Sequence, residues 1–89
     1  MKHKYNKAAA LKYRHGQDSA PTLVAKGKGK VAEQIVQIAK EHGIAIKEDR
    51  ELVEFLSMLD LYQEIPPELY RAVAEILAFV YSINKKAML

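Results

Sequence analysis

Two short apolar runs predict two strands in the first third of the chain. Residues 8–13 form a short apolar stretch, and residues 22–25 form a compact apolar run with strand character. Residues 14–21 between them contain the Gly, Asp, Ser and Pro that are typical of loops. We therefore expect the two strands to lie side by side as an antiparallel pair with a long connection.

The hydrophobic period becomes helical from Lys30 onward. A left-handed glycine at Gly43 is expected to end this helix, and residues 44–47 then alternate apolar side chains as a third strand would. A strand, a helix and a strand in this order form a βαβ unit, so the strands at 22–25 and 44–47 are predicted to be parallel. The inward face of the helix is expected to carry Val31, Ala32, Ile35, Ile38 and Ala39.

Two more helices complete the prediction. Asp49 is a suitable N-cap for the second helix, and Pro67 is tolerated in the first turn of the third, which is expected to reach about Asn84. The fold class is therefore α/β: a small mixed sheet of about three strands with one βαβ unit, packed with three helices. We expect one domain at residues 8–84, between a flexible basic tail at 1–7 and a C-terminal tail at 85–89. The inward positions are Leu52, Val53, Leu56 and Leu59, then Leu69, Val73, Ile76, Leu77, Val80 and Ile83.

Charge is divided unevenly along the 89 residues, whose formal net charge is +3. Residues 1–30 contain eight Lys or Arg and one acidic residue, whereas residues 31–89 contain six basic and ten acidic residues. The basic first third suits nucleic acid, an anionic membrane surface or an acidic protein partner, and equally suits a solvated segment with no partner.

Composition narrows the class of protein. Without cysteine there is no disulfide framework and no thiolate zinc site. The longest apolar run, residues 76–81, is far shorter than the roughly 20 residues that span a membrane, and the N-terminus lacks the apolar core of a signal peptide. We expect a small intracellular domain.

No catalytic pattern is complete. Gly27–Lys30 offers glycines and lysines ahead of a helix, but it lacks the third glycine of a dinucleotide motif and the Ser/Thr of a P-loop. His3, His15 and His42 show no metal-ligand spacing. We expect no cofactor, no metal and no enzymatic activity, which leaves a surface for recognition.

Four segments, in order, closely resemble one family. They are Ala-Ala-Ala-Leu-Lys-Tyr at 8–13, Ala-Pro-Thr-Leu-Val-Ala-Lys-Gly-Lys-Gly at 20–29, the stretch at 38–46, and the stretch at 63–81 containing Pro-Pro-Glu-Leu-Tyr. Together they resemble the cytoplasmic C-terminal domain of the FlhB/YscU family of type III secretion export-apparatus proteins. The resemblance covers about residues 7–82.

The family resemblance implies a self-cleaving Asn-Pro-Thr-His loop, and this chain departs from it. In register, the four positions are His3, Lys4, Tyr5 and Asn6, none of which matches. An imidazole at the first position cannot form the cyclic imide through which the family's asparagine cuts its own backbone. The chain is therefore expected to resemble the post-cleavage fragment, without the upstream membrane helices and the strand before the scissile bond.

The role implied by the resemblance is that of a non-enzymatic protein-interaction module in export-substrate recognition and switching. Expected partners are export-apparatus proteins, secreted flagellar or type III substrates, and a membrane-bound relative. The expected location is cytoplasmic, at the periphery of the membrane-embedded export apparatus. The sequence of residues 63–81 resembles flagellar members of the family and so favours a flagellar rather than a virulence secretion system.

Without the upstream strand, residues 8–13 should form an open sheet edge flanked by basic side chains. We expect this edge to bind a strand of a membrane-bound relative or an acidic segment. The predicted partner-binding residues are Ala9, Leu11, Lys12, Tyr13, Arg14, Lys26, Lys28 and Lys30.

Two other functions stay open at this point. A basic nucleic-acid-binding domain would use residues 2–14 and 26–30, and its affinity would fall steeply with salt. A small anion-binding enzyme would instead bind a saturable ligand at Gly27–Lys30.

The missing cleavage motif yields a direct prediction. Purified protein incubated at neutral pH should stay intact by mass spectrometry, because no asparagine stands where the family's cyclising asparagine does. Two fragments separated near residues 3–6 would contradict it.

Overall fold

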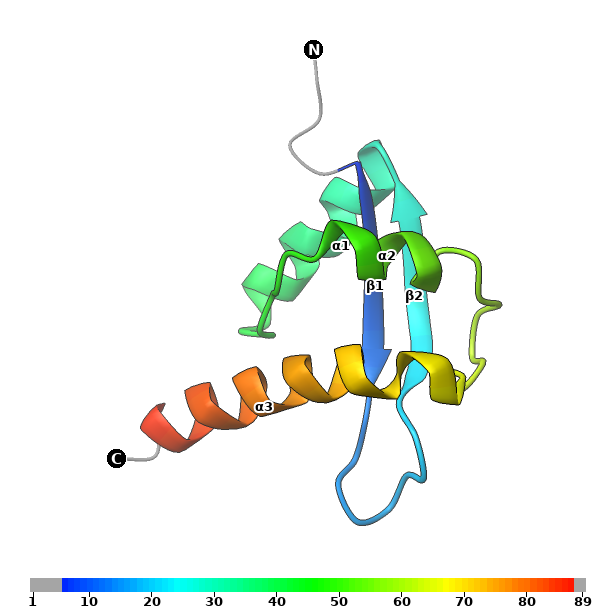
Figure 1. Ribbon diagram of the computed structural model, residues 1–89. Helices are drawn as coiled ribbons and strands as arrows, with labels where there is room; N and C mark the ends of the chain where they lie inside the picture. The colour runs from blue at the N-terminus through cyan, green and yellow to red at the C-terminus, as the bar shows by residue number, and fades with distance from the viewer. Residues whose placement is uncertain (1–5, 88–89) are drawn as a thin grey trace.

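The computed structural model describes residues 6–87, and these residues form a two-stranded sheet with helices on both faces (Figure 1). Strand β1 precedes a long loop, β2 leads directly into α1, and α2 and α3 follow in the second half. The elements are β1 (Lys7–Lys12), β2 (Thr22–Lys28), α1 (Lys30–Glu41), α2 (Arg50–Leu56), the 3₁₀ helix η1 (Pro67–Leu69) and α3 (Tyr70–Ala87).

The predicted antiparallel strand pair is confirmed. Lys7 lies opposite Lys28, and the register continues to Ala10 opposite Ala25 before an irregularity shifts it by one residue. The second strand is longer than predicted, because it continues through Gly27 instead of ending there. A side chain at Gly27 would collide with Val31, since a Cβ would lie 2.2 Å from its Cγ1, so glycine permits the tight turn from β2 into α1.

The predicted third strand and the βαβ unit are wrong. Residues 44–49 form no strand, and the described sheet contains only β1 and β2. Both edges of β2 are engaged at its start: β1 pairs with one, and residues 62–65 bond the other through Leu23 N–H to Gln63 O (2.9 Å) and Ile65 N–H to Pro21 O (2.9 Å). A parallel strand at residues 44–47 therefore cannot pair with the start of β2.

Each face of the sheet buries its own apolar cluster. On one face, Ala8 packs with Ala32 and Val36 of α1. On the other face, Ala9 and Leu11 pack against the cluster formed with α2 and α3, and Figure 1 shows α1 behind the strands and α2 in front. The second cluster has the buried members Ala20, Leu52, Leu56, Ile65 and Val73.

Helix α1 buries only part of the face that its apolar pattern predicts: Ala32 is buried, and Ile35 packs against the same cluster. Val31 and Ile38 are 49% and 54% exposed, whereas Ala32 and Val36 are buried. The small side chain of Ala32 lets the helix approach the alanine-rich strand closely, so the helix packs through Ala32 and Val36.

Two helix ends predicted from sequence, at Asp49 and Gly43, are confirmed. Asp49 Oδ1 accepts the Leu52 N–H at 3.0 Å as the N-cap of α2. Gly43 adopts a φ of 67°, and its N–H bonds Lys40 O at 3.2 Å at the end of α1. His42 also contacts this helix end, with Nδ1 3.0 Å from Ile38 O.

Helix α3 extends beyond the core. It begins after η1, buries Val73 and continues to Ala87, past the predicted end. Ile83, predicted to face inward, is 42% exposed, because the C-terminal half of the helix projects away from the sheet (Figure 1). Among the described residues, no helix is long and apolar enough to cross a membrane.

Candidate functional site: an open strand edge and an adjacent apolar pocket

The outer edge of β1 carries backbone groups that have no hydrogen-bond partner among residues 6–87. Asn6 O accepts the Gly29 N–H at 2.8 Å, which extends the register of the two strands. Because paired and unpaired positions alternate in an antiparallel ladder, Ala8 and Ala10 bond toward β2 while Ala9 points its N–H and C=O outward.

The backbone N–H and C=O of Leu11 point outward for a related reason. Its opposite residue, Leu23, donates to Gln63 O (2.9 Å) and accepts from Tyr62 N–H (2.6 Å), so both backbone groups of Leu23 face away from β1. In a non-hydrogen-bonded pair of an antiparallel ladder, the backbone groups of both residues point away from the partner strand. Within residues 6–87, no hydrogen bond reaches the outward groups of Ala9 or Leu11.

The sequence prediction placed Ala9 and Leu11 at a partner-binding edge, and in the structure only their backbone groups lie on the outer edge of β1. Their side chains pack against the core cluster beneath α2 and α3. A partner would therefore meet a row of amides and carbonyls rather than these two side chains.

A second row of unpaired backbone lies near this edge. Residues 45–48 take part in no backbone hydrogen bond among the described residues. Ile46 packs against the cluster that contains Ala8, and Figure 1 shows this segment, just before α2, on the side of β1 away from β2.

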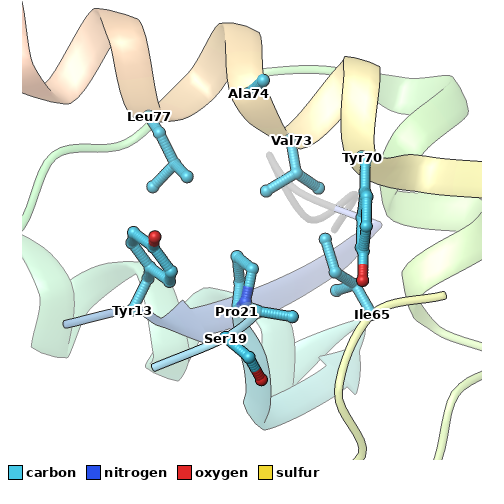
Figure 2. Close-up of a pocket in the computed structure, with 9 residues that line it drawn as sticks. Tyr13, Ser19, Pro21, Ile65, Tyr70, Val73, Ala74 and Leu77 are labelled. Carbon is cyan, nitrogen blue, oxygen red and sulfur yellow. The ribbon is translucent and has the colours of Figure 1, made fainter. Parts of the chain in front are cut away.

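An apolar pocket of about 140 Å³ opens where the chain leaves β1 (Figure 2). Val73 and Leu77 of α3 point toward Tyr13 and Pro21, with the Tyr70 ring at one end. Most of its lining is apolar, so it suits a hydrophobic group. The lining residues are Tyr13, Ser19, Ala20, Pro21, Ile65, Tyr70, Val73, Ala74 and Leu77.

The loop at residues 14–18 contains an internal ion pair between Arg14 and Asp18. Arg14 N–H donates to Asp18 Oδ2 at 2.8 Å, and Arg14 Nη2 lies 3.1 Å from Asp18 Oδ1. The side-chain hydrogen bond from Arg14, followed by the backbone one, lowers the pKa of Asp18. The contribution of these bonds to stability is therefore present at neutral pH and is lost as pH falls through the lowered pKa of Asp18.

The predicted basic residues do not form one patch. Lys12, Lys28 and Lys30 are exposed, but Lys12 ends β1 while Lys28 lies opposite its first residue. Arg14 pairs within its loop, as described above, and does not join them.

Lys26 has a structural position that the sequence did not reveal. Its Nζ donates to Ser57 O (3.2 Å) and Leu59 O (2.6 Å), at the C-terminal end of α2, and these bonds are partly buried. A cation here satisfies carbonyls that a helix end leaves unpaired. Lys26 therefore joins α2 to the sheet, and no sequence signal links it to residues 31 positions away.

Of the four positions aligned with the cleavage loop, His3, Lys4 and Tyr5 lie outside the described residues. Asn6 is exposed, and its carbonyl bonds Gly29 as described above. Among residues 6–87, no group of three His, Cys, Asp or Glu is arranged to hold a metal ion.

Comparison with known proteins gives consistent matches. The profile described as the FlhB HrpN YscU SpaS family matches residues 5–80. The chain is 46% identical to the protein YlqH of Bacillus subtilis, over 89% of this chain and 85% of that protein. It is 45% identical to the flagellar biosynthetic protein FlhB of Aquifex aeolicus, again over 89% of this chain, but spans only 23% of that protein.

Two crystal structures share the fold. The cytoplasmic domain of FlhB from Shewanella putrefaciens matches with a TM-score of 0.84 and 33% identity, over 94% of this chain and 71% of the other. The PscU C-terminal domain matches with a TM-score of 0.80 and 29% identity, over 84% and 96%.

The contact of Lys26 predicts a selective loss of stability. Replacing Lys26 with Met should lower the free energy of unfolding by about 1–3 kcal/mol, because two partly buried carbonyls lose a charged donor. Urea denaturation followed by circular dichroism measures this. The matched Lys28→Met change removes an exposed lysine and should alter stability by no more than about 0.5 kcal/mol. Equal losses in the two variants would contradict the assignment.

Proposed function

The chain belongs to the FlhB, HrpN, YscU and SpaS family, and we propose that it acts as a non-enzymatic docking module in type III protein export. The observation that carries the proposal is the outer edge of β1, where Ala9 and Leu11 present unpaired backbone groups. The module works on the cytoplasmic side of the export apparatus, where it meets export components and secreted proteins.

The edge of β1 accepts an extended segment of a membrane-bound relative. Strand addition to an exposed edge gains its affinity from main-chain hydrogen bonds, each contributing about 0.5–1.5 kcal/mol net. Lys7 and Lys12 at the two ends of the strand disfavour pairing between two copies of this chain, as edge lysines do.

Residues 45–48 support the same occupant. The backbone of these residues also has no hydrogen-bond partner among the described residues. Ile46, which belongs to this segment, packs on the cluster that contains Ala8. A strand bound beside β1 would pair with β1 along one edge. Its other edge could then form hydrogen bonds with the backbone of residues 45–48. The accepted segment thereby completes a sheet that β1 and β2 begin.

The apolar pocket next to the edge takes a hydrophobic side chain of a secreted protein. Its volume of about 140 Å³ is well below the roughly 300–1,000 Å³ of small-molecule sites, which favours a single side chain over a nucleotide. The hydroxyl groups of Tyr13 and Tyr70 supply the few polar contacts that orient a peptide at such a site.

The module does not cleave itself. Residues 3–6 read His-Lys-Tyr-Asn where the family's loop has Asn-Pro-Thr-His, so the cyclising side chain is replaced. Any part that this chain takes in switching between export substrates therefore depends on binding alone.

The alternative of a nucleic-acid-binding domain has weaker support. It requires the basic residues of the first third to form one surface, but Lys7 bonds Glu54 (2.7 Å), Arg14 bonds Asp18 and Lys26 bonds the end of α2. A basic surface binding phosphates would show affinity that falls steeply with salt. Salt-insensitive binding of a protein strand, with no retention of RNA or DNA, separates the two functions.

A proline at Ala9 tests the edge. Ala9→Pro removes an outward N–H and spares the bonds to β2, so affinity for a peptide matching the strand upstream of a membrane-bound relative's cleavage loop should fall by about tenfold or more. Isothermal titration calorimetry measures the affinity, and an unchanged circular dichroism spectrum shows that the fold is intact. Ala9→Ser keeps the N–H and serves as the control. A folded Ala9→Pro protein that binds like the parent would exclude the edge.

A carboxylate at Ala74 tests the pocket. Ala74 is exposed yet lines the pocket, so Ala74→Glu should abolish binding of a segment from an exported rod or hook protein while leaving stability nearly unchanged. Ser82→Glu places the same charge farther along α3, away from the pocket, and should bind like the parent. Equal binding by Ala74→Glu, measured by fluorescence anisotropy, would contradict the assignment.

A further inference from the structure

A second groove, separate from the apolar pocket, lies between α2 and the start of α3. Its volume is about 280 Å³, and none of its lining residues lines the pocket beside β1. The floor is apolar: Leu52 is buried, Leu69 and Ala72 are partly buried, and Phe55 keeps 48% of its surface exposed. A half-exposed aromatic ring in a concave surface is a feature that a partner can cover with a gain in free energy.

Three carboxylates surround this floor, and none of the described residues that line the groove is a lysine or arginine. Asp49, Glu51 and Glu68 are all exposed. Asp49 accepts the Leu52 N–H, but within residues 6–87 neither Glu51 nor Glu68 takes part in an ion pair. The groove therefore combines an apolar floor with a rim of one sign of charge.

This combination restricts what can bind. A wholly apolar segment would strip water from the rim carboxylates without replacing it, which costs free energy. An acidic segment or a nucleic acid would bring like charge to the rim. A segment with one apolar side chain between cationic ones covers the floor and neutralises the rim at the same time.

We propose that the groove between α2 and α3 docks a basic amphipathic segment of a partner protein, with one large apolar side chain over Leu52 and Phe55 and lysine or arginine on either side. The cations meet Asp49 and Glu51 at one wall and Glu68 at the other. The groove shares no lining residue with the apolar pocket, so the protein can hold this segment while that pocket is occupied.

A synthetic peptide tests the proposal. The probe carries one phenylalanine flanked on both sides by lysines, labelled for fluorescence anisotropy with the full chain. Glu51→Gln and Glu68→Gln should each weaken binding by about two- to fivefold, as expected for exposed charge pairs. Phe55→Ala should weaken it by about tenfold, because the apolar contact is lost. Chemical-shift changes on binding should map to Leu52, Phe55, Leu69 and Ala72.

Matched controls make the test decisive. Glu41→Gln removes an exposed carboxylate from α1, far from the groove, and should leave binding unchanged. The peptide with alanine in place of phenylalanine should bind at least about tenfold more weakly. The proposal is overturned if Glu41→Gln weakens binding as much as Glu51→Gln, if the alanine peptide binds equally well, or if no binding occurs at millimolar concentration. Loss of the edge or pocket functions in other variants would not affect this result.

Discussion

The hydrogen bonds between β2 and residues 62–65 determine which edge of the sheet stays open. Leu23 exchanges bonds with Tyr62 and Gln63, and Ile65 N–H bonds Pro21 O. With β1 on the other side, both edges of β2 are engaged along this stretch. Along this stretch, the outer edge of β1 is then the edge that the described residues leave open to a partner strand.

The same contact builds the pocket. By drawing residues 62–65 onto the start of β2, it places Ile65 beside Pro21 and brings the first turns of α3 over the end of β1. Tyr13 belongs both to the chain leaving the open strand and to the wall of the pocket. A strand bound at the edge and a side chain bound in the pocket would therefore contact neighbouring parts of one surface.

Local patterns predicted local structure well and long-range pairing poorly. The N-cap at Asp49 and the left-handed Gly43 follow from residues within one helical turn, and both are confirmed. Residues 44–47 have a strand-like sequence pattern but form no strand. The pairing of residues 62–65 with β2 leaves no periodic signal in the sequence. The position of Lys26 at the end of α2 and the pocket lining were missed for the same reason: each joins segments that are distant in the chain.

The central claim is that the outer edge of β1 is free until a partner strand binds, and amide hydrogen exchange followed by NMR tests it most directly. The free protein should exchange the amides of Ala9 and Leu11 quickly while that of Ala10 is protected, and the upstream strand of a membrane-bound relative should slow both. If Ala9 and Leu11 are already protected as strongly as Ala10 in the free protein, the edge is not open and the account is wrong.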